Sequence, residues 1–143
     1  MVAEKLQKLV VVTPARVVFT DEVRMVCARG AAGDLGILPD HAPLITALKT
    51  DVVRIQKDGG WRHMAVSSGF LEAKDNRVVI LADAAELAEE IDVERARRAK
   101  ERAEERLRAR APDVDIVRAE AALLRALARL KAVDMAGGPP RRH

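Results

Sequence analysis

The 143-residue sequence is short of aromatic side chains and of residues that coordinate metals. It has one cysteine, three histidines, one tryptophan, two phenylalanines and no tyrosine. A single cysteine excludes an internal disulfide, and one cysteine with three histidines cannot build a closed zinc site without carboxylates. The shortage of aromatics also removes the stacking surfaces on which single-stranded nucleic acids bind. We therefore expect no disulfide, no metal site and no nucleic-acid partner.

Long apolar runs are also missing. The longest aliphatic stretches, residues 9–12 and 78–82, fall far short of the roughly 20 residues that a membrane-spanning helix needs. Residues 1–5 lack the charged, then apolar, then small layout of a secretory signal. We expect no direct membrane insertion and a cytosolic location.

Neither half of the chain has a large surplus of one charge. Residues 1–84 hold 11 Lys and Arg against 10 Asp and Glu, and residues 85–143 hold 14 against 12. Binding to a phosphate backbone needs a surplus of cations on one face. This balance is a second reason to expect no nucleic-acid partner.

Residues 1–84 contain short β-branched runs separated by Gly, Pro or Asp, which is the pattern of strands and turns. No helical pattern lies between these runs, which favours an antiparallel β sandwich over a parallel sheet. The predicted strands cover residues 6–13, 15–20, 22–29, 44–48, 51–56, 61–67, 69–73 and 77–82.

Residues 85–136 are rich in Ala, Glu, Arg and Leu, which are strong helix formers. Asp92 is placed to cap a first helix that Pro112 ends, and Asp113 or Asp115 to cap a second. The short link between them makes the helices antiparallel, so the fold class is α+β: a β sandwich followed by a two-helix hairpin. The tail, residues 137–143, is predicted to be disordered.

The predicted hairpin has few large apolar residues to bury. The stripe of the first helix consists of alanines and Leu107, so its packing free energy is small. Ion pairs four residues apart, Glu94 with Arg98 and Glu104 with Arg108, add only a few tenths of a kcal/mol each. Such a hairpin can open or dock elsewhere; the alternative is a stable, alanine-packed hairpin.

The sequence lacks the usual signatures of catalysis. No Ser or Cys sits in a Gly-x-Ser-x-Gly elbow near a histidine, and no glycine-rich phosphate loop carries the lysine that such loops require. We expect a non-enzymatic protein. The loop of residues 33–44 instead places Leu35, Ile37 and Leu38 among Gly and Pro, which indicates either a core plug or a binding surface.

Four segments together resemble one family. They are Val11-Val12-Thr13-Pro14, the loop of residues 33–44, the pair of segments 65–72 and 79–83, and the helical hairpin. Over residues 5–133 the chain resembles the epsilon subunits of bacterial rotary (F-type) ATP synthases. The resemblance implies a flattened sandwich of about ten strands, with two short strands in the loop, followed by two helices.

This resemblance implies a central-stalk subunit without an active site, which binds the gamma subunit and contacts the c-ring. Asp34 corresponds to the family's c-ring contact, and Thr13 and His41 to its gamma-facing side. For His41 a loop-fixing hydrogen bond is an equal alternative. The implied location is peripheral, on the cytoplasmic face of the bacterial plasma membrane, within the assembled complex.

The resemblance also implies that the hairpin moves. In this family it folds against the sandwich or extends along gamma toward the catalytic alpha and beta subunits, where it impedes ATP hydrolysis. A solvated helical face is the ordinary alternative for its many cations. The residues that would face an acidic segment of the beta subunit are Arg97, Arg98, Lys100, Arg118, Arg125, Arg129 and Lys131.

Residues 91–96, Ile-Asp-Val-Glu-Arg-Ala, resemble the Ile/Leu-Asp-x-x-Arg-Ala motif of epsilon subunits that bind ATP in the folded hairpin. The resemblance predicts ATP as a regulatory ligand, with no cofactor required. An adaptor of another assembly, with no nucleotide role, stays open. The predicted ATP-binding residues are Glu86, Ile91, Asp92, Arg95, Ala96, Arg102, Arg125 and Arg129.

Overall fold

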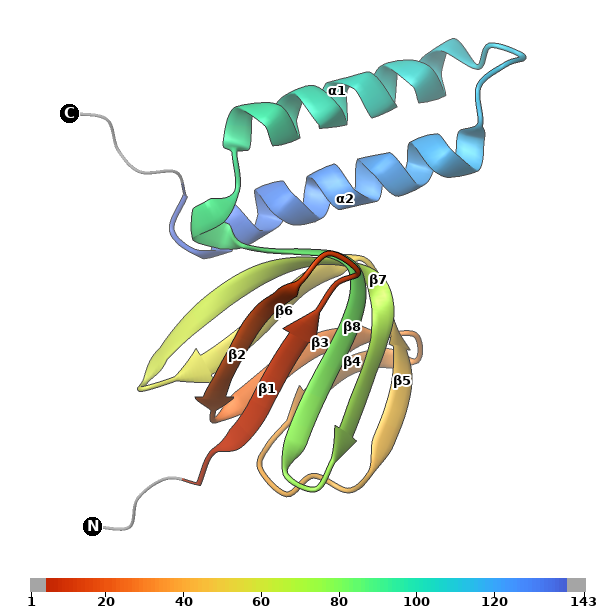
Figure 1. The fold of residues 1–143 in the computed structure, drawn as a ribbon. Helices are drawn as coiled ribbons and strands as arrows, with labels where there is room; N and C mark the ends of the chain where they lie inside the picture. The colour runs from red at the N-terminus through yellow and green to blue at the C-terminus, as the bar shows by residue number, and fades with distance from the viewer. Residues whose placement is uncertain (1–4, 139–143) are drawn as a thin grey trace, which may run out of the picture.

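A computed structural model of the chain describes residues 5–138. A β sandwich is followed by a two-helix hairpin that lies across one end of it (Figure 1), which confirms the predicted fold class. The elements are β1 (Gln7–Val12), β2 (Val17–Val23), β3 (Met25–Gly30), β4 (Gly33–Ile37), β5 (Leu44–Leu48), β6 (Asp51–Lys57), β7 (Gly60–Lys74), β8 (Arg77–Leu87), the 3-10 helix η1 (Ala88–Glu90), α1 (Val93–Ala109) and α2 (Ile116–Met135).

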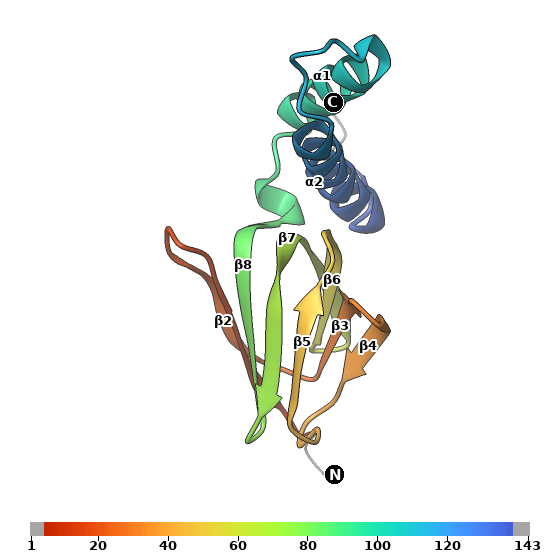
Figure 2. The ribbon, with the colours of Figure 1, turned by 90° about the vertical axis from the view of Figure 1, so that its right-hand side faces the viewer.

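The strands run in the order β2-β1-β8-β7-β5-β3-β4, and β6 pairs with β3 and β7. All pairs are antiparallel except β1 with β8, which is parallel. The long strand β7 pairs with β6 through residues 60–66 and with β5 through residues 69–73. Its two halves thereby connect the two layers, which Figure 2 shows from the side.

The core of the sandwich follows the two-residue period of its strands. Leu9 and Val11 of β1 and Val78 and Ile80 of β8 are completely buried, whereas Leu81 beside them is exposed. Because both layers contribute aliphatic side chains of this kind, the interior fills without aromatic residues other than Phe19.

The described part of the chain has eight strands, not the ten or so that the resemblance implied. The loop of residues 33–44 supplies one strand, β4, and the two strands predicted at 61–67 and 69–73 are one, β7. Gly69 lies where β7 approaches its partner β8 so closely that a Cβ atom would come within 2.0 Å of the Leu81 carbonyl oxygen. The boundary expected between residues 84 and 85 falls inside β8.

Each hairpin helix begins at an aspartate that caps it. Asp92 accepts a hydrogen bond from the Arg95 backbone N–H (3.1 Å), and Asp115, rather than Asp113, accepts one from the Arg118 N–H (3.0 Å). The first helix ends before Pro112, because Arg110 takes the left-handed conformation (φ 46°) that closes a helix C-terminus.

The ion pairs on α1 differ from those predicted. Glu94 pairs with Arg97 (2.8 Å) and Glu105 with Arg108 (2.7 Å), each three residues apart rather than four. Both spacings place side chains on one face of a helix, so the sequence alone does not choose between them. Of the predicted tail, Gly137 and Gly138 follow α2 with positive φ angles, and residues 139–143 lie outside the described range.

The hairpin docks on the sandwich through α2. Its C-terminal half packs on β6, β7 and the linker between sandwich and hairpin (Figure 1). The contact is a small cluster built mainly from alanines, separate from the core of the sandwich. Its buried members are Val52, Ala65, Ala88, Ile91, Ala96, Ala128, Ala132 and Val133.

Candidate functional site

The segment that joins sandwich to hairpin forms one wall of a pocket. After β8 ends at Leu87, η1 makes one turn, Ile91 returns to extended backbone and is buried, and Asp92 starts α1. This path places the N-terminus of α1, with its free backbone N–H groups, beside the end of β8. A helix N-terminus favours negatively charged ligands.

We call this cavity of about 410 Å³ the linker pocket. Residues come to it from β8, the linker, the first three turns of α1, and α2, so the pocket exists only when the hairpin is folded against the sandwich. Its lining residues are Glu86, Glu90, Ile91, Asp92, Arg95, Ala96, Ala99, Arg102 and Arg129.

Seven of the eight residues that the sequence predicted for ATP binding line the linker pocket. The exception is Arg125, which is half-buried on α2, one helical turn before Arg129. Glu90 and Ala99 also line the pocket and were not predicted. Ala99 lies one turn after Arg95, so its spacing could have identified it, but no sequence signal marked Glu90.

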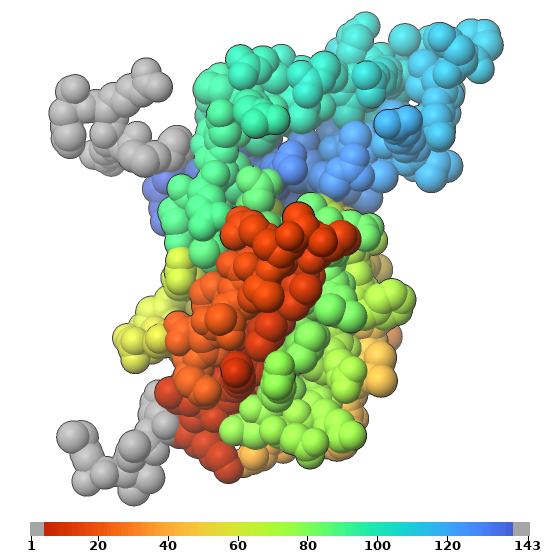
Figure 3. Space-filling view, in the orientation of Figure 1, coloured from red at the N-terminus to blue at the C-terminus, as the bar shows by residue number. Residues whose placement is uncertain are grey.

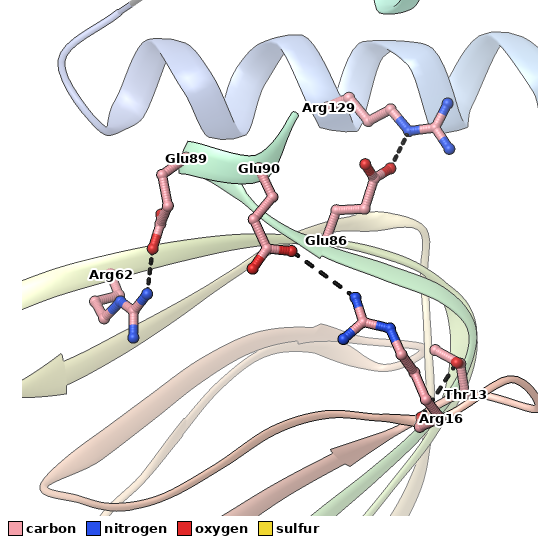
Figure 4. A network of polar contacts seen from close by, with 7 residues as sticks. All are labelled: Thr13, Arg16, Arg62, Glu86, Glu89, Glu90 and Arg129. Atoms are coloured by element: carbon pink, nitrogen blue, oxygen red, sulfur yellow. Dashed lines mark hydrogen bonds and ion pairs between the residues drawn. The ribbon is translucent and has the colours of Figure 1, made fainter. Parts of the chain in front are cut away.

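Three arginines, Arg95, Arg102 and Arg129, bring positive charge to the linker pocket from two helices. Arg129 Nε donates a hydrogen bond to Glu86 Oε1 at 2.7 Å, and both side chains are about one-third exposed (35%) (Figure 4). This pair ties α2 to β8 across the pocket. Guanidinium groups of this kind bind phosphate oxygens in pairs of hydrogen bonds.

A second ionic contact holds α2 at strand β6. Asp51 accepts hydrogen bonds from Lys131 Nζ (2.8 Å), Arg29 (3.2 Å) and the Val52 backbone N–H (2.7 Å). Burial alone would raise the pKa of Asp51, but these donors outweigh it and leave the pKa lowered. The carboxylate is therefore a charged link between sandwich and hairpin.

The linker is also held from the sandwich side. Glu89 pairs with Arg62 of β7. Glu90 Oε2 lies 3.9 Å from a guanidinium nitrogen of Arg16, the residue that precedes β2 (Figure 4). Burial would raise the pKa of Glu89, but hydrogen bonds from its own backbone and from Arg62 leave it lowered. The linker thus carries two carboxylates, each facing an arginine of the sandwich.

The outer face of the sandwich carries an apolar row that crosses five strands. The register pairs Ala47 of β5 with Phe70 of β7, Phe70 with Leu81 of β8, Leu81 with Val12 of β1, and Val12 with Val17 of β2. Phe70, Leu81 and Val17 are each more than half exposed. We call these five residues the apolar row. An exposed contiguous apolar surface of this kind is typical of a protein-binding site.

The three predicted contact residues are spread over the sandwich. Thr13, after β1, lines a groove of about 590 Å³ along the apolar row. His41 lies beyond the other end of β1, in the β4–β5 loop, where its Nδ1 is 2.7 Å from the Ala42 carbonyl oxygen. Asp34 is exposed at the start of β4, opposite Arg29. Thr13 and His41 therefore do not form one cluster, and His41 makes the local hydrogen bond expected as its alternative.

Within residues 5–138 no group of three or more His, Cys, Asp or Glu side chains is arranged to hold a metal ion. None of the helices in that range is both long and apolar enough to span a bilayer.

Comparison with known proteins gives a consistent result over both domains. A family model described as the beta-sandwich domain of the ATP synthase delta/epsilon chain matches residues 6–88, and one described as the long alpha-helix domain of the same chain matches residues 89–134. The first match ends one residue after β8, and the second ends one residue before the end of α2.

Curated relatives match nearly the whole chain. An ATP synthase epsilon chain of Desulforamulus reducens is 53% identical over 130 residues, which cover 91% of this chain and 98% of the relative. The epsilon chain of Moorella thermoacetica is 57% identical over 125 residues, which cover 87% of this chain and 93% of the relative. That of Bacillus velezensis is 52% identical over 133 residues, which cover 93% of this chain and 98% of the relative.

Solved structures of low sequence identity share the fold. A chain of the Euglena gracilis mitochondrial ATP synthase, from a structure of its OSCP, F1 and c-ring, has a TM-score of 0.64 at 22% identity and covers 95% of this chain and 83% of its own. A chain from a structure of the central stalk and c-ring of the Tetrahymena thermophila mitochondrial ATP synthase has a TM-score of 0.50 at 14% identity. The match covers 62% of this chain and 72% of the Tetrahymena chain.

Proposed function

This chain belongs to the ATP synthase delta/epsilon chain family, and we propose that its folded hairpin is an ATP-sensing latch of the central stalk. The epsilon chain is a non-catalytic subunit of the complex, as the absence of catalytic motifs predicted. Its role is to join the rotating parts and to regulate hydrolysis, from a peripheral position on the cytoplasmic face of the bacterial membrane.

The observation that carries the proposal is the convergence of residues in the linker pocket. Arg95 and Arg102 come from α1, Arg129 from α2 and Glu86 from β8. A triphosphate bound there would contact all three elements at once. A ligand that binds only the folded hairpin stabilises it by an amount set by its concentration relative to Kd.

The weak docking of the hairpin supports a movable latch. The contact with the sandwich buries mainly alanines, so its apolar stabilisation is small. Arg129 and Lys131, which are expected to face the beta subunit in the extended state, are engaged by Glu86 and Asp51 in the folded state. Opening the hairpin would free both cations for contact with the alpha and beta subunits.

The apolar row supports docking of the gamma subunit on the outer face of the sandwich. Thr13 borders this row, whereas His41 lies at the far end of the sandwich, so we assign the gamma contact chiefly to the row and the Thr13 turn. Asp34 is exposed and keeps its proposed role as a c-ring contact.

Calorimetric titration of ATP into the full chain tests the nucleotide site. We expect saturable binding that is lost in the Arg125→Ala/Arg129→Ala double variant, because it removes Arg129 from the lining of the pocket and Arg125 from α2 one helical turn before it. The control, Arg98→Ala/Arg106→Ala, removes two exposed cations of α1 that do not line the pocket and should bind normally. Absence of binding at millimolar ATP would overturn the proposal.

Inhibition is tested separately in the assembled enzyme. Removing residues 89–143 deletes the hairpin and leaves the sandwich strands complete. We expect ATP hydrolysis to rise, because the extended hairpin is then missing. Unchanged hydrolysis would show that the hairpin does not inhibit, whatever its affinity for ATP.

A further inference from the structure

One carboxylate of the linker pocket has its ionic partner outside the pocket. Glu86 pairs with Arg129, and Asp92 caps α1, but Glu90 faces Arg16, which belongs to the turn between β1 and β2. Arg16 and Glu90 side chains are 60% and 50% exposed, with nitrogen and oxygen 3.9 Å apart. Figure 4 shows Arg16 reaching up to Glu90 from the sandwich.

The charge of Glu90 works against an anionic ligand. Its side chain lines the same cavity as Arg95, Arg102 and Arg129, so an uncompensated carboxylate there would repel a triphosphate. Arg16 offsets this charge from outside the pocket, without itself lining it. The arginine therefore acts on the pocket through another residue.

The turn that carries Arg16 also borders the apolar row. The Thr13 backbone N–H and Oγ1 both donate to the Arg16 carbonyl oxygen, at 2.9 and 3.3 Å, and Thr13 and Pro14 line the groove along the row. In Figure 3 the atoms of this turn lie against those of the linker at the top of the sandwich. The same turn thus borders the groove with Thr13 and Pro14 and places Arg16 beside Glu90 of the linker.

We propose that Arg16 is a positioning residue of the linker pocket, which neutralises Glu90 and thereby raises the affinity of the pocket for a triphosphate. This rests on the proposed function, because it needs the pocket to bind a triphosphate.

A double-mutant cycle on ATP affinity tests the coupling between Arg16 and Glu90. Titration calorimetry would compare the full wild-type chain with Arg16→Gln, Glu90→Gln and the double variant. We expect Arg16→Gln to raise Kd about 2- to 5-fold, the range for an exposed ion pair. In the Glu90→Gln background the same change should have no further effect, and Arg16→Lys should restore most of the affinity.

A matched control separates pocket electrostatics from a general loosening of the linker. Arg62 pairs with Glu89 on the same linker, but Glu89 lines a different cavity, so Arg62→Gln should leave Kd unchanged. The loss in Arg16→Gln should also shrink as salt is added, because the pair is exposed. A purely structural role of Arg16 would not follow ionic strength in this way.

Several results would overturn the proposal. An equal loss with Glu90 present or replaced would mean that Arg16 acts without Glu90, and an equal loss in Arg62→Gln would mean that the linker as a whole matters. ATP binding by the wild type with no change in Arg16→Gln would overturn this inference alone. No ATP binding by the wild type would overturn the proposed function together with it.

Discussion

The sandwich and the hairpin are both folded, but they are stabilised by different kinds of side chain. The buried core of the sandwich contains large aliphatic residues such as Leu9, Ile55 and Leu71, whereas the contact that holds the hairpin on the sandwich buries mainly alanines such as Ala128 and Ala132. Burying a large aliphatic side chain contributes roughly 1.5–3 kcal/mol, and an alanine much less. The sandwich is therefore stabilised by much more apolar burial than the contact between it and the hairpin.

The contact between the hairpin and the sandwich, which we call the joint, contains charged side chains as well as small apolar ones. Asp51 with Lys131 and Glu86 with Arg129 link α2 to the sandwich, beside the alanine-rich contact. Glu86 and Arg129 are each about one-third exposed and lose little when the contact opens, because water replaces their partners, whereas the Asp51 side chain is only 14% exposed and loses more. A joint of this composition suits reversible docking.

Truncating the core of the sandwich should have the largest effect on stability. Leu71 is completely buried, and Leu71→Ala leaves a cavity that costs about 2–5 kcal/mol of unfolding free energy. Denaturant unfolding followed by circular dichroism measures this loss. Its neighbour Phe70 is 58% exposed, so Phe70→Ala should change stability little; an equal loss in both would contradict the assignment of the core.

Overfilling the joint should release the hairpin and spare the sandwich. Ala132 is completely buried where α2 meets the sandwich, so Ala132→Leu should cost about 1–3 kcal/mol of docking free energy. Hydrogen exchange should quicken in α1 and α2 and stay unchanged in β7 and β8. The same substitution at the exposed Ala109 is the control. Faster exchange in the strands as well would mean that the two regions unfold together.

Removing the Asp51 charge should have the smallest effect and a defined pH dependence. Because the pKa of Asp51 is lowered from 3.8 in the folded hairpin, its contribution is present above about pH 4 and is lost as the pH falls through the lowered pKa. Fluorescence of Trp61, which shares a cavity with Val133 and Met135 of α2, should report this loss in the wild type.

The Asp51→Asn variant isolates that transition. It should lack the acid transition and show a slightly more open joint at neutral pH, while Asp113→Asn in the exposed helix connection serves as the control. An acid transition of equal size in Asp51→Asn would assign the change to other carboxylates with lowered pKa, such as Asp21 or Glu89.

Much of the fold could be predicted from local patterns, and the exceptions have physical causes. The helix cap at Asp92 was predicted, and the second cap was narrowed to Asp113 or Asp115, because capping depends on a few neighbouring residues. The continuity of β7 through Gly69 was not predicted, because a glycine in a sequence indicates a break between strands. In the structure Gly69 instead lets β7 approach its neighbour β8 closely. The ion-pair spacing on α1 depends on rotamers that a helical period does not specify.

The candidate site also has a part that could be predicted from the sequence and a part that could not. The motif at residues 91–96 and the arginines of both helices were visible in the sequence, and seven of the eight predicted residues line one pocket. Glu90 and its partner Arg16 are separated by 74 positions in the chain, and neither belongs to a motif. No sequence pattern could relate them, because only the path of the linker brings them together.

The sequence by itself determined the two kinds of structure, the helix starts and the family, because these follow from local periodicity, capping and short motifs. The tertiary structure alone decided which cations converge and which carboxylates oppose them. A pocket built from β8, a linker and two helices depends on how the hairpin docks. That docking rests on small contacts between residues far apart in the chain, such as Asp51 with Lys131, which no local pattern encodes.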